Sequence, residues 1–300
     1  MKALVPILIL FAGLIYWFLF DGRLTDTSDY SSDMVQIRQL ADSMEGDKPT
    51  EIQVEKVAQF YFFQTLSRAG SGFDVVPMGV YSFKAVTSSG HVLIDVGYDE
   101  EMALSARADF YPEPYQRMQT ALNTADLIVV THEHYDHIGG IVQHPNPADI
   151  LPNVILTTEQ VAAPANIRPR FPQGLPEDFE PFELDRYAAI APGIVLIKAN
   201  GHTPGSLMVF VQLENGREYL FVGDIAWHEA SIDTPILRPR VITQIFLPEE
   251  NRDILSAQLR FLNQLSEEEE KLIQVAGHDN EQIEAFFEQG LMSNQFRQEK

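Results

Sequence analysis

The sequence predicts an α+β protein, because its β-rich runs fall into two batches separated by helical segments. The first batch contains Val75 to Thr87 and His91 to Gly97, which a short turn at Gly90 joins into a hairpin. The second batch comprises residues 193–199, 207–213 and 219–222. A length of 300 residues with 45% hydrophobic residues is enough to bury a large core.

The N-terminus is an uninterrupted apolar run. Ala3 to Phe20 could form a helix that crosses a bilayer at about 1.5 Å per residue, with Trp17 near its outer end. We therefore predict one N-terminal transmembrane helix that uses residues 3–20 as its membrane contact. The positive-inside rule would keep Lys2 cytoplasmic and place the following domain on the exported, periplasmic or extracytoplasmic side. Cleaved secretion is the alternative, although no small-x-small cleavage site follows Phe20.

A polar stretch follows the apolar run. Residues 21–33 are rich in Asp, Ser and Thr, which favours a tether, and a short helix is expected from Ser32. We therefore divide the chain into residues 1–20 (anchor or signal segment), 21–48 (polar tether with a short helix) and 49–300 (catalytic domain).

The remaining elements are predicted from periodicity and turn residues. Asp126 to Val130 is a short buried strand, and a helix is expected to begin near Asp136. Residues 163–193 carry six prolines in no clear period and are expected to form a long loop. Further strands are expected at residues 52–63, 154–157 and 272–275, and further helices at residues 112–124, 249–265 and 280–292.

One dense cluster of metal-type residues follows the strand that ends at Val130. His132, His134, Asp136 and His137 lie within six residues, in a chain that has only 8 histidines. Imidazole and carboxylate are the ligands that a borderline-soft divalent metal prefers. The cluster therefore predicts the nucleus of a metal site.

Three later strands also end in a metal-type residue. His202 lies in a Gly/Pro loop, Asp224 follows residues 219–222, and His278 follows the last strand. Alone, each is a weak signal, because a single strand-end histidine is more often an ordinary hydrogen-bonded residue. Together with the cluster they give seven candidate ligands at the same type of strand-to-loop junction.

Composition excludes several other chemistries. The net charge of −22 repels phosphate backbones, so we expect no nucleic-acid partner. The absence of cysteine excludes disulfides, thiolate nucleophiles and cysteine-ligated metals.

These motifs resemble those of the metallo-β-lactamase superfamily over roughly residues 50 to 290. The resemblance rests on His132-x-His134-x-Asp136-His137, Gly201-His202-Thr-Pro-Gly205, Gly223-Asp224, Gly277-His278 and the upstream Leu93-Ile-Asp95-x-Gly97. It implies a four-layer αββα sandwich with a two-metal site at one edge of the sheets. It also implies that Asp95 is a structural aspartate behind the site.

The resemblance divides the seven residues between two divalent ions, for which we expect zinc and leave iron and manganese open. The first ion would be held by His132, His134 and His202, the second by Asp136, His137 and His278, with Asp224 bridging. Two such ions about 3.5–4 Å apart share a hydroxide that is nucleophilic near neutral pH. The catalytic residues would be Asp224 and Asp136, the latter relaying a proton to the leaving group.

Differences from individual branches of the superfamily narrow the range of reactions that the chain is expected to catalyse. His134 stands where the flavodiiron branch has glutamate, and Asp224 is generally lacking in the zinc β-lactamases. Thioesterases of the glyoxalase II type share all seven ligands, but their basic C-terminal helices are not evident here. Quorum-quenching lactonases also share the ligands, but usually carry tyrosine where this chain has Trp227.

We therefore expect a dinuclear metal-dependent hydrolase in which the bridging hydroxide attacks the carbonyl of a small ester or lactone. Two alternatives stay open: a thioester hydrolase of the glyoxalase II type, and a mononuclear-iron oxidoreductase resembling the persulfide dioxygenases. Trp227, His228 and Tyr135 are the candidate substrate-binding residues, and Asp279 is expected to cap the last helix. The sequence makes no prediction of oligomeric state.

Overall fold

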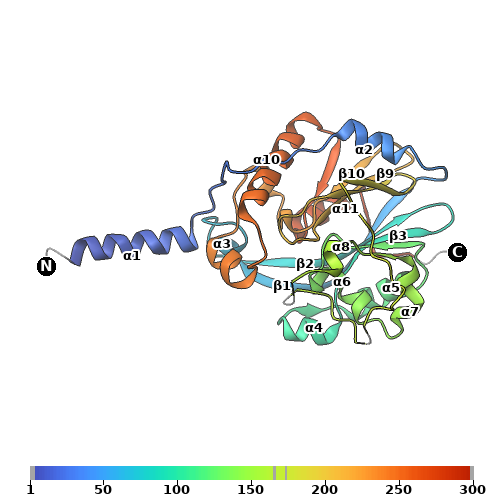
Figure 1. Ribbon diagram of the computed structural model, residues 1–300, viewed down its shortest axis with the longest axis horizontal. Helices are drawn as coiled ribbons and strands as arrows, with labels where there is room; N and C mark the ends of the chain where they lie inside the picture. Colours follow the sequence, from blue (N-terminus) through green and yellow to red (C-terminus); the bar gives the residue numbers. More distant parts are fainter. Residues whose placement is uncertain (1–3, 165–166, 173, 298–300) are drawn as a thin grey trace.

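A computed structural model describes residues 4–164, 167–172 and 174–297, and shows two β-sheets packed face to face (Figure 1). The first sheet has the order β12-β1-β2-β3-β5-β6, with β4 paired to β1. Its strands are β1 (Glu51–Phe63), β2 (Val75–Val86), β3 (His91–Val96), β4 (Asp109–Phe110), β5 (Leu127–Val129), β6 (Val154–Ile155) and β12 (Ser293–Asn294). Strands β3, β5 and β6 are parallel, so their carboxyl ends lie at one edge of the sheet.

The second sheet has the order β11-β10-β9-β8-β7. Its strands are β7 (Tyr187–Ala191), β8 (Ile194–Lys198), β9 (Leu207–Gln212), β10 (Glu218–Phe221) and β11 (Leu272–Val275). Strands β7 to β10 form an antiparallel meander, whereas β11 returns parallel to β10. The carboxyl ends of β10 and β11 therefore lie side by side.

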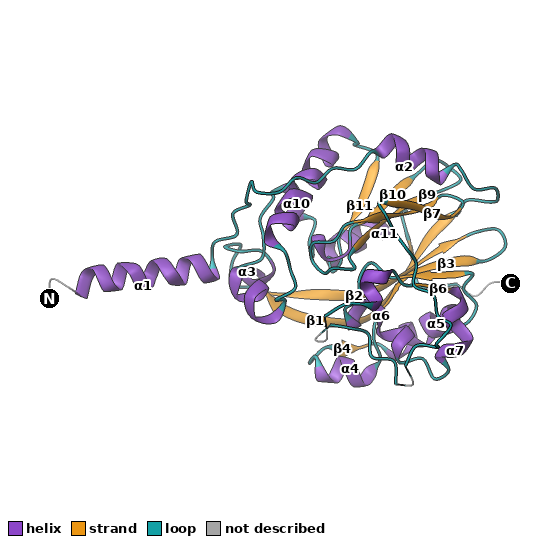
Figure 2. Cartoon of the chain, in the orientation of Figure 1, coloured by secondary structure: helices purple, strands orange, loops and turns teal. Residues whose placement is uncertain are grey.

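Helices cover the outer face of each sheet (Figure 2). Those on the first sheet are α4 (Glu100–Ser105), α5 (Pro112–Leu122) and α6 (Tyr135–Val142), and those on the second are α2 (Met34–Ala41) and α10 (Arg252–Glu268). The other helices of the domain are α3 (Gln64–Ser67), α7 (Pro147–Ile150), α8 (Thr158–Val161), α9 (Ala230–Asp233) and α11 (Asn280–Glu288). The predicted four-layer αββα sandwich is confirmed.

The central core lies between the two sheets. Phe83 of the first sheet and Phe221 of the second face each other with ring centroids 4.8 Å apart. Both are buried in one cluster with Ile94, Leu196 and Val209. Each such side chain stabilises the fold by roughly 1.5–3 kcal/mol when fully buried. This packing fixes the sheets against each other, and with them the loops at their common edge.

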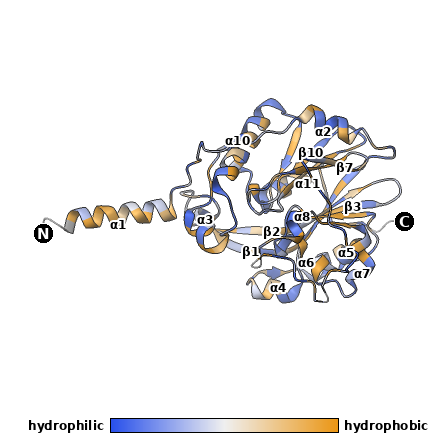
Figure 3. Cartoon of the chain, viewed as in Figure 1, coloured by the Kyte–Doolittle hydropathy of each residue, from blue (hydrophilic) through white to orange (hydrophobic). Residues whose placement is uncertain are grey.

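The N-terminal helix α1 (Leu4–Leu19) projects from the sandwich and is apolar along its length (Figure 3). Its 16 described residues span about 24 Å at about 1.5 Å per residue, which is shorter than a hydrocarbon core of about 30 Å. Among the described residues, no helix combines the length and the apolar character needed to cross a membrane. The predicted transmembrane helix is therefore wrong, and so is the membrane-anchored localisation that depended on it.

The segment predicted as a polar tether lies along α10 and the second sheet. The Thr25 amide donates to Ser256 Oγ at 3.1 Å, and Arg260 Nη2 donates to the Ser28 carbonyl at 3.0 Å. The Tyr30 hydroxyl donates to the Lys198 carbonyl at 3.0 Å. These contacts hold the segment against the domain.

Most strands predicted from the sequence lie within one or two residues of the observed bounds, and β11 agrees at both ends. Two differences affect the site. The loop predicted over residues 163–193 contains β7, because its Tyr and Ala residues pair with β8. A π-helix, Ile242–Phe246, precedes α10 in a stretch for which we had predicted no element.

Candidate metal centre

The seven predicted ligands lie where strands of both sheets end. In the first sheet, β5 ends at Val129 and leads through His132 and His134 to α6, whose first turn carries Asp136 and His137. In the second sheet, His202, Asp224 and His278 follow β8, β10 and β11 in that order. The structure brings all seven together in two groups, each of which could hold a metal ion.

The first group contains His132, His134, His202 and Asp224, with ligand atoms within 4.8 Å of one another. His134 Nδ1 lies 3.0 Å from His132 Nε2 and 3.1 Å from His202 Nε2. Asp224 Oδ2 lies 3.4 Å from His202 Nε2. Ligands about 3.3 Å apart are expected around a tetrahedral ion with bonds of about 2.0–2.1 Å. The group therefore fits one zinc-sized ion.

The second group contains Asp136, His137 and His278, and the other oxygen of Asp224 faces it. Asp136 Oδ2 lies 3.8 Å from His137 Nε2 and 3.6 Å from His278 Nε2. Asp224 Oδ1 lies 3.4 Å from His137 Nε2 and 3.2 Å from His278 Nε2. Among the described residues, Asp224 is thus the carboxylate that reaches both groups, as its predicted bridging role requires.

Two polar atoms of the second group lack a hydrogen bond within the described chain. His137 Nε2 and Asp224 Oδ1 are buried and have no hydrogen-bond partner. Leaving such an atom unsatisfied costs about 1–3 kcal/mol, and more for a charged group. Both atoms face the centre of the second group, so a bound cation would satisfy them. The donor set fits a pair of divalent ions.

The electrostatic environments of the two groups differ. Burial lowers the pKa of His132 and His202, which leaves both imidazoles neutral and able to bind a metal. Burial also opposes the charged forms of His137 and His278, but nearby carboxylates outweigh it and raise both pKa values. Burial alone would raise the pKa of Asp224, yet the surrounding imidazoles hold it well below its usual range.

Two backing contacts orient the histidines of the second group. His137 Nδ1 lies 2.9 Å from Asp95 Oδ2, and Asp95 also accepts the Thr131 amide at 2.7 Å. Asp95 has φ 55°, a left-handed conformation that is uncommon for a non-glycine residue and is often found near functional sites. His278 Nδ1 lies 2.7 Å from the Gly79 carbonyl oxygen.

The structure places three residues behind the ligands that the sequence did not predict: Glu249, Glu250 and Arg238. His134 Nε2 lies 2.9 Å from Glu249 Oε1, and His202 Nδ1 lies 2.9 Å from Glu250 Oε2. Arg238 is buried beside them and donates from Nε to Glu250 at 3.1 Å and from Nη2 to the Asp224 carbonyl at 2.9 Å. No local spacing links these residues to the histidine motif, so only the tertiary fold reveals them.

A pocket of about 510 Å³ opens onto both groups. It is lined by Phe60, His134, Tyr135, Asp136, Ile167, Asp224, Trp227, Ile245, Phe246, Leu247, Pro248, Glu249 and His278. Most of its apolar wall comes from residues 245–248, a segment that sequence reasoning did not assign to the site. The proline-rich loop contributes Ile167 among the described lining residues.

Trp227 lines the pocket, and its predicted contact with substrate stays a prediction. Its indole Nε1 also donates to Asp224 Oδ2 at 2.7 Å. The guanidinium of Arg238 lies over its ring, 4.4 Å from the centroid. The residue is only 7% exposed. Trp227 therefore supports the shared carboxylate with its polar edge and faces the pocket with its apolar surface.

Of the two other residues predicted to contact substrate, one lines the pocket and the other is not among its described lining residues. Tyr135 lines the pocket, and its hydroxyl accepts the Arg170 amide at 3.2 Å. His228 is not among the lining residues, and its Nδ1 lies 3.9 Å from Asp279 Oδ2. Asp279 caps α11 by accepting the Glu281 amide, as predicted.

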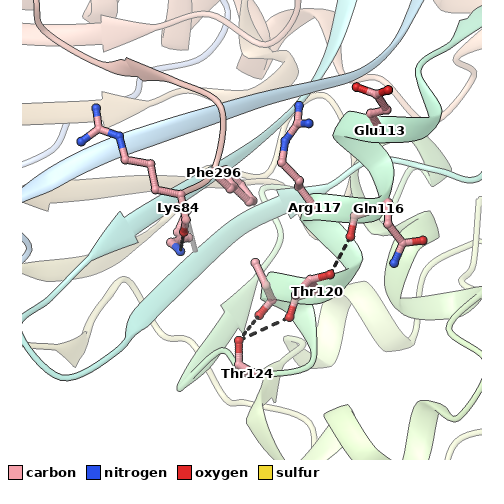
Figure 4. A pocket seen from close by; sticks show the side chains of 9 residues that line it. Lys84, Glu113, Gln116, Arg117, Thr120, Thr124 and Phe296 are labelled. Atoms are coloured by element: carbon pink, nitrogen blue, oxygen red, sulfur yellow. Dashed lines mark hydrogen bonds between the residues drawn. The ribbon is translucent and has the colours of Figure 1, made fainter. Parts of the chain in front are cut away.

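Figure 4 shows a separate pocket, of about 570 Å³, between α5, β2 and the segment after β12. Lys84, Arg117 and Arg297 lie along it, but Arg117 is already paired with Glu55 at 2.6 Å. Its described lining residues include no histidine and one acid, Glu113. This pocket lacks the chemistry of the metal centre.

The comparisons with known proteins identify the superfamily and the fold of the chain. The family model of the metallo-beta-lactamase superfamily matches residues 76–278. A quorum-quenching N-acyl homoserine lactone lactonase is similar in structure, with a TM-score of 0.64 and 15% identity, over 80% of this chain and 97% of that chain.

Two further solved structures share the fold at similarly low identity. AidC, a dizinc quorum-quenching lactonase, has a TM-score of 0.54 and 17% identity, over 79% of this chain and 90% of that chain. A probable metal-dependent hydrolase from Staphylococcus aureus has a TM-score of 0.57 and 12% identity, over 78% of this chain and 91% of that chain.

Proposed function

The chain belongs to the metallo-beta-lactamase superfamily. We propose that it is a metal-dependent hydrolase that cleaves a small, uncharged carboxylic ester or lactone with an apolar arm. The observation that carries the proposal is the pocket that joins two donor groups through Asp224 to a largely apolar wall. The metal-binding side chains provide a position for the reacting carbonyl group, and the apolar wall of the pocket provides a position for the rest of the substrate.

The proposed ligand sets follow the two groups. His132, His134 and His202 would hold the first ion, Asp136, His137 and His278 the second, and Asp224 both. Zinc suits the imidazole-rich first set, and iron or manganese would also be accepted by such ligands. When bound, the two ions supply Lewis acidity, which activates a water molecule and polarises the carbonyl.

The protein side chains supply the remaining steps. Asp136 lines the pocket and its side chain is 24% exposed, so it can reach a leaving group and relay a proton to it. Trp227 offers no acidic hydroxyl, and its N–H is engaged by Asp224. Proton delivery is therefore assigned to Asp136, and the indole keeps the shared carboxylate in place.

The side chains around the pocket offer no positive charge to bind an anionic group far from the metal ions. Among its described lining residues the acids are Asp136, Asp224 and Glu249, and none is Lys or Arg. Arg168 donates to the Ala163 carbonyl at 2.9 Å and does not line the pocket. An anionic carrier, as in a glutathione thioester, would meet no cationic side chain here. This contrast places the thioester hydrolase second to the ester or lactone hydrolase.

The test is a substrate panel with the full-length, metal-replete protein and elemental analysis of the same sample. Two metal equivalents and hydrolysis of uncharged esters or lactones, faster with an apolar arm, are the expected results. Faster cleavage of anionic thioesters would refute the substrate assignment. One iron per chain with no hydrolysis would refute the dinuclear proposal in favour of the oxidoreductase alternative.

The bridging role of Asp224 has its own test. The variant Asp224→Ala should lose at least one metal equivalent and most of its hydrolytic activity while its circular dichroism spectrum stays native. Unchanged metal content in this variant would remove the shared-carboxylate centre.

A further inference from the structure

We infer that Glu249 and Glu250 are positioning residues that make the first group the tighter of the two metal sites, so that the two ions bind in a fixed order. The inference rests on the two-metal centre of the proposed function. It goes further by assigning the order of binding to two consecutive side chains outside the ligand set.

Glu249 fixes the imidazole that lies at the centre of the first group. Its Oε1 lies 2.9 Å from His134 Nε2, and its side chain is only 3% exposed. An Nε2–H that donates to this carboxylate leaves the lone pair on Nδ1. That nitrogen lies 3.0 Å from His132 Nε2 and 3.1 Å from His202 Nε2, so it faces the metal position.

Glu250 acts in the same way on His202. Its Oε2 lies 2.9 Å from His202 Nδ1, which leaves Nε2 to face the metal position. The Glu250 side chain is fully buried, and the buried guanidinium of Arg238 balances its charge. A carboxylate behind a metal-binding histidine fixes its tautomer and orientation and increases its basicity.

The backbone holds both glutamates in register with the ligands. The Asn251 amide donates to the Gly201 carbonyl at 2.7 Å, which ties this segment to the loop that carries His202. The Asn251 side chain also accepts the Asp253 and Ile254 amides and so caps α10. The two carboxylates are thus anchored by a helix of 17 residues, which reduces the ordering needed when the first ion binds.

The ligands of the second group are held in position less firmly than those of the first group. His137 and His278 are backed by Asp95 and by the Gly79 carbonyl. The third ligand, Asp136, is 24% exposed, and its Oδ2 lies 3.8 Å from His137 Nε2 and 3.6 Å from His278 Nε2, which is longer than a hydrogen bond. Binding the second ion must therefore fix a partly exposed side chain more tightly than it is held without metal, at a cost in conformational entropy.

The experiment titrates the metal-free full-length protein with Co²⁺ alone, against a competing chelator, and follows the cobalt absorption bands of each equivalent. The wild type should show a tight first equivalent and a weaker second one with a different spectrum. Glu249→Leu should weaken the first equivalent about 10–100-fold, because second-layer partners have effects of this size. Glu249→Gln should weaken it less, because the amide oxygen still accepts the hydrogen bond.

Two further variants complete the test. Asp136→Asn should weaken only the second equivalent, and Glu288→Gln, which changes an exposed acid at the end of α11, should change neither. The inference is overturned if Glu249→Leu binds its first equivalent as tightly as the wild type. It is also overturned if Asp136→Asn weakens the first equivalent more than the second.

The readout is independent of substrate. A protein that binds ions in this order without cleaving any ester would keep the inference and lose the proposed function. A protein that cleaves esters but binds both ions with equal affinity would keep the proposed function and lose the inference.

Discussion

Replacing Trp227 with phenylalanine removes the indole N–H that donates to Asp224 Oδ2 at 2.7 Å and keeps an aromatic ring in the pocket wall. A hydrogen bond to a charged group contributes about 1.5–3 kcal/mol to stability. The smaller ring leaves a void that costs roughly 1 kcal/mol more. We therefore expect metal-free Trp227→Phe to lose about 2.5–4 kcal/mol in its free energy of unfolding.

The loss should be smaller when metal is bound. An ion in the first group would neutralise part of the charge on Asp224, and the indole N–H would then donate to a less charged oxygen. The hydrogen-bond contribution should fall from the range for charged acceptors to about 0.5–1.5 kcal/mol, and roughly 1 kcal/mol from the smaller ring remains in both states. The difference between the two states therefore measures the part of the hydrogen bond that depends on the charge of Asp224.

Urea unfolding followed by far-ultraviolet circular dichroism, in chelator and in excess zinc, measures both values. The matched control is Trp17→Phe, because the chain has 2 tryptophans and Trp17 is 43% exposed. This control should lose less than the Trp227 variant and should respond equally with and without zinc. An unchanged stability of metal-free Trp227→Phe, or an equal loss in both states, would refute the reasoning.

Two other predictions concern buried charge and pH. Arg238→Met leaves the buried Glu250 carboxylate without its counter-charge and should destabilise the protein by about 3–5 kcal/mol in urea unfolding. The double variant Arg238→Met with Glu250→Leu should recover much of this loss, because it removes the unpaired charge as well. A double variant no more stable than the single one would contradict this account. Carboxylates raise the pKa of His137 and His278, whereas burial lowers that of His132 and His202. Protons therefore compete with the metal ion at a higher pH in the second group than in the first. Isothermal titration with zinc should show that the second equivalent weakens first as the pH falls below neutrality. Loss of both equivalents over the same pH range would contradict this prediction.

The ligand set could be predicted from the sequence because each ligand lies in a short local motif at a strand end. His132 to His137 follow β5, and His202, Asp224 and His278 each follow a strand of the second sheet. The alternating runs that define these strands are also local features. The seven convergent residues could therefore be predicted from local sequence, and the sandwich followed from the resemblance of their motifs to the metallo-beta-lactamase superfamily.

The surroundings of the ligands could not be predicted in this way. Glu249 and His134 are 115 positions apart, and Glu250 and His202 are 48 apart, with no periodicity that relates them. The pocket wall at residues 245–248 begins within the π-helix Ile242–Phe246, an element that hydrophobic spacing does not signal. The hydrogen bond from the Trp227 indole to Asp224 could not be predicted either, because a spacing of three residues does not say which way the indole N–H points.

The N-terminal error has a different origin. Counting apolar residues from Ala3 to Phe20 measures hydropathy, but a membrane span depends on how many of them are helical. The helix ends at Leu19, where the Phe20 and Asp21 amides both donate to the Tyr16 carbonyl. Asp21 then pairs with Arg240 at 2.9 Å and turns the chain onto the domain.

The segment from Ile245 to Glu250 joins two properties that enzymes often keep on separate loops. Its first half shapes the mouth of the pocket, and its second half orients two imidazoles of the first group. Substrate range and metal retention therefore cannot evolve independently in this chain. Ile245 and Phe246, which are 59% and 68% exposed, offer room for divergence, whereas changes at Pro248 would be transmitted to the cofactor. Directed evolution toward new substrates should accumulate changes at the two exposed positions and avoid Pro248, which precedes the two glutamates.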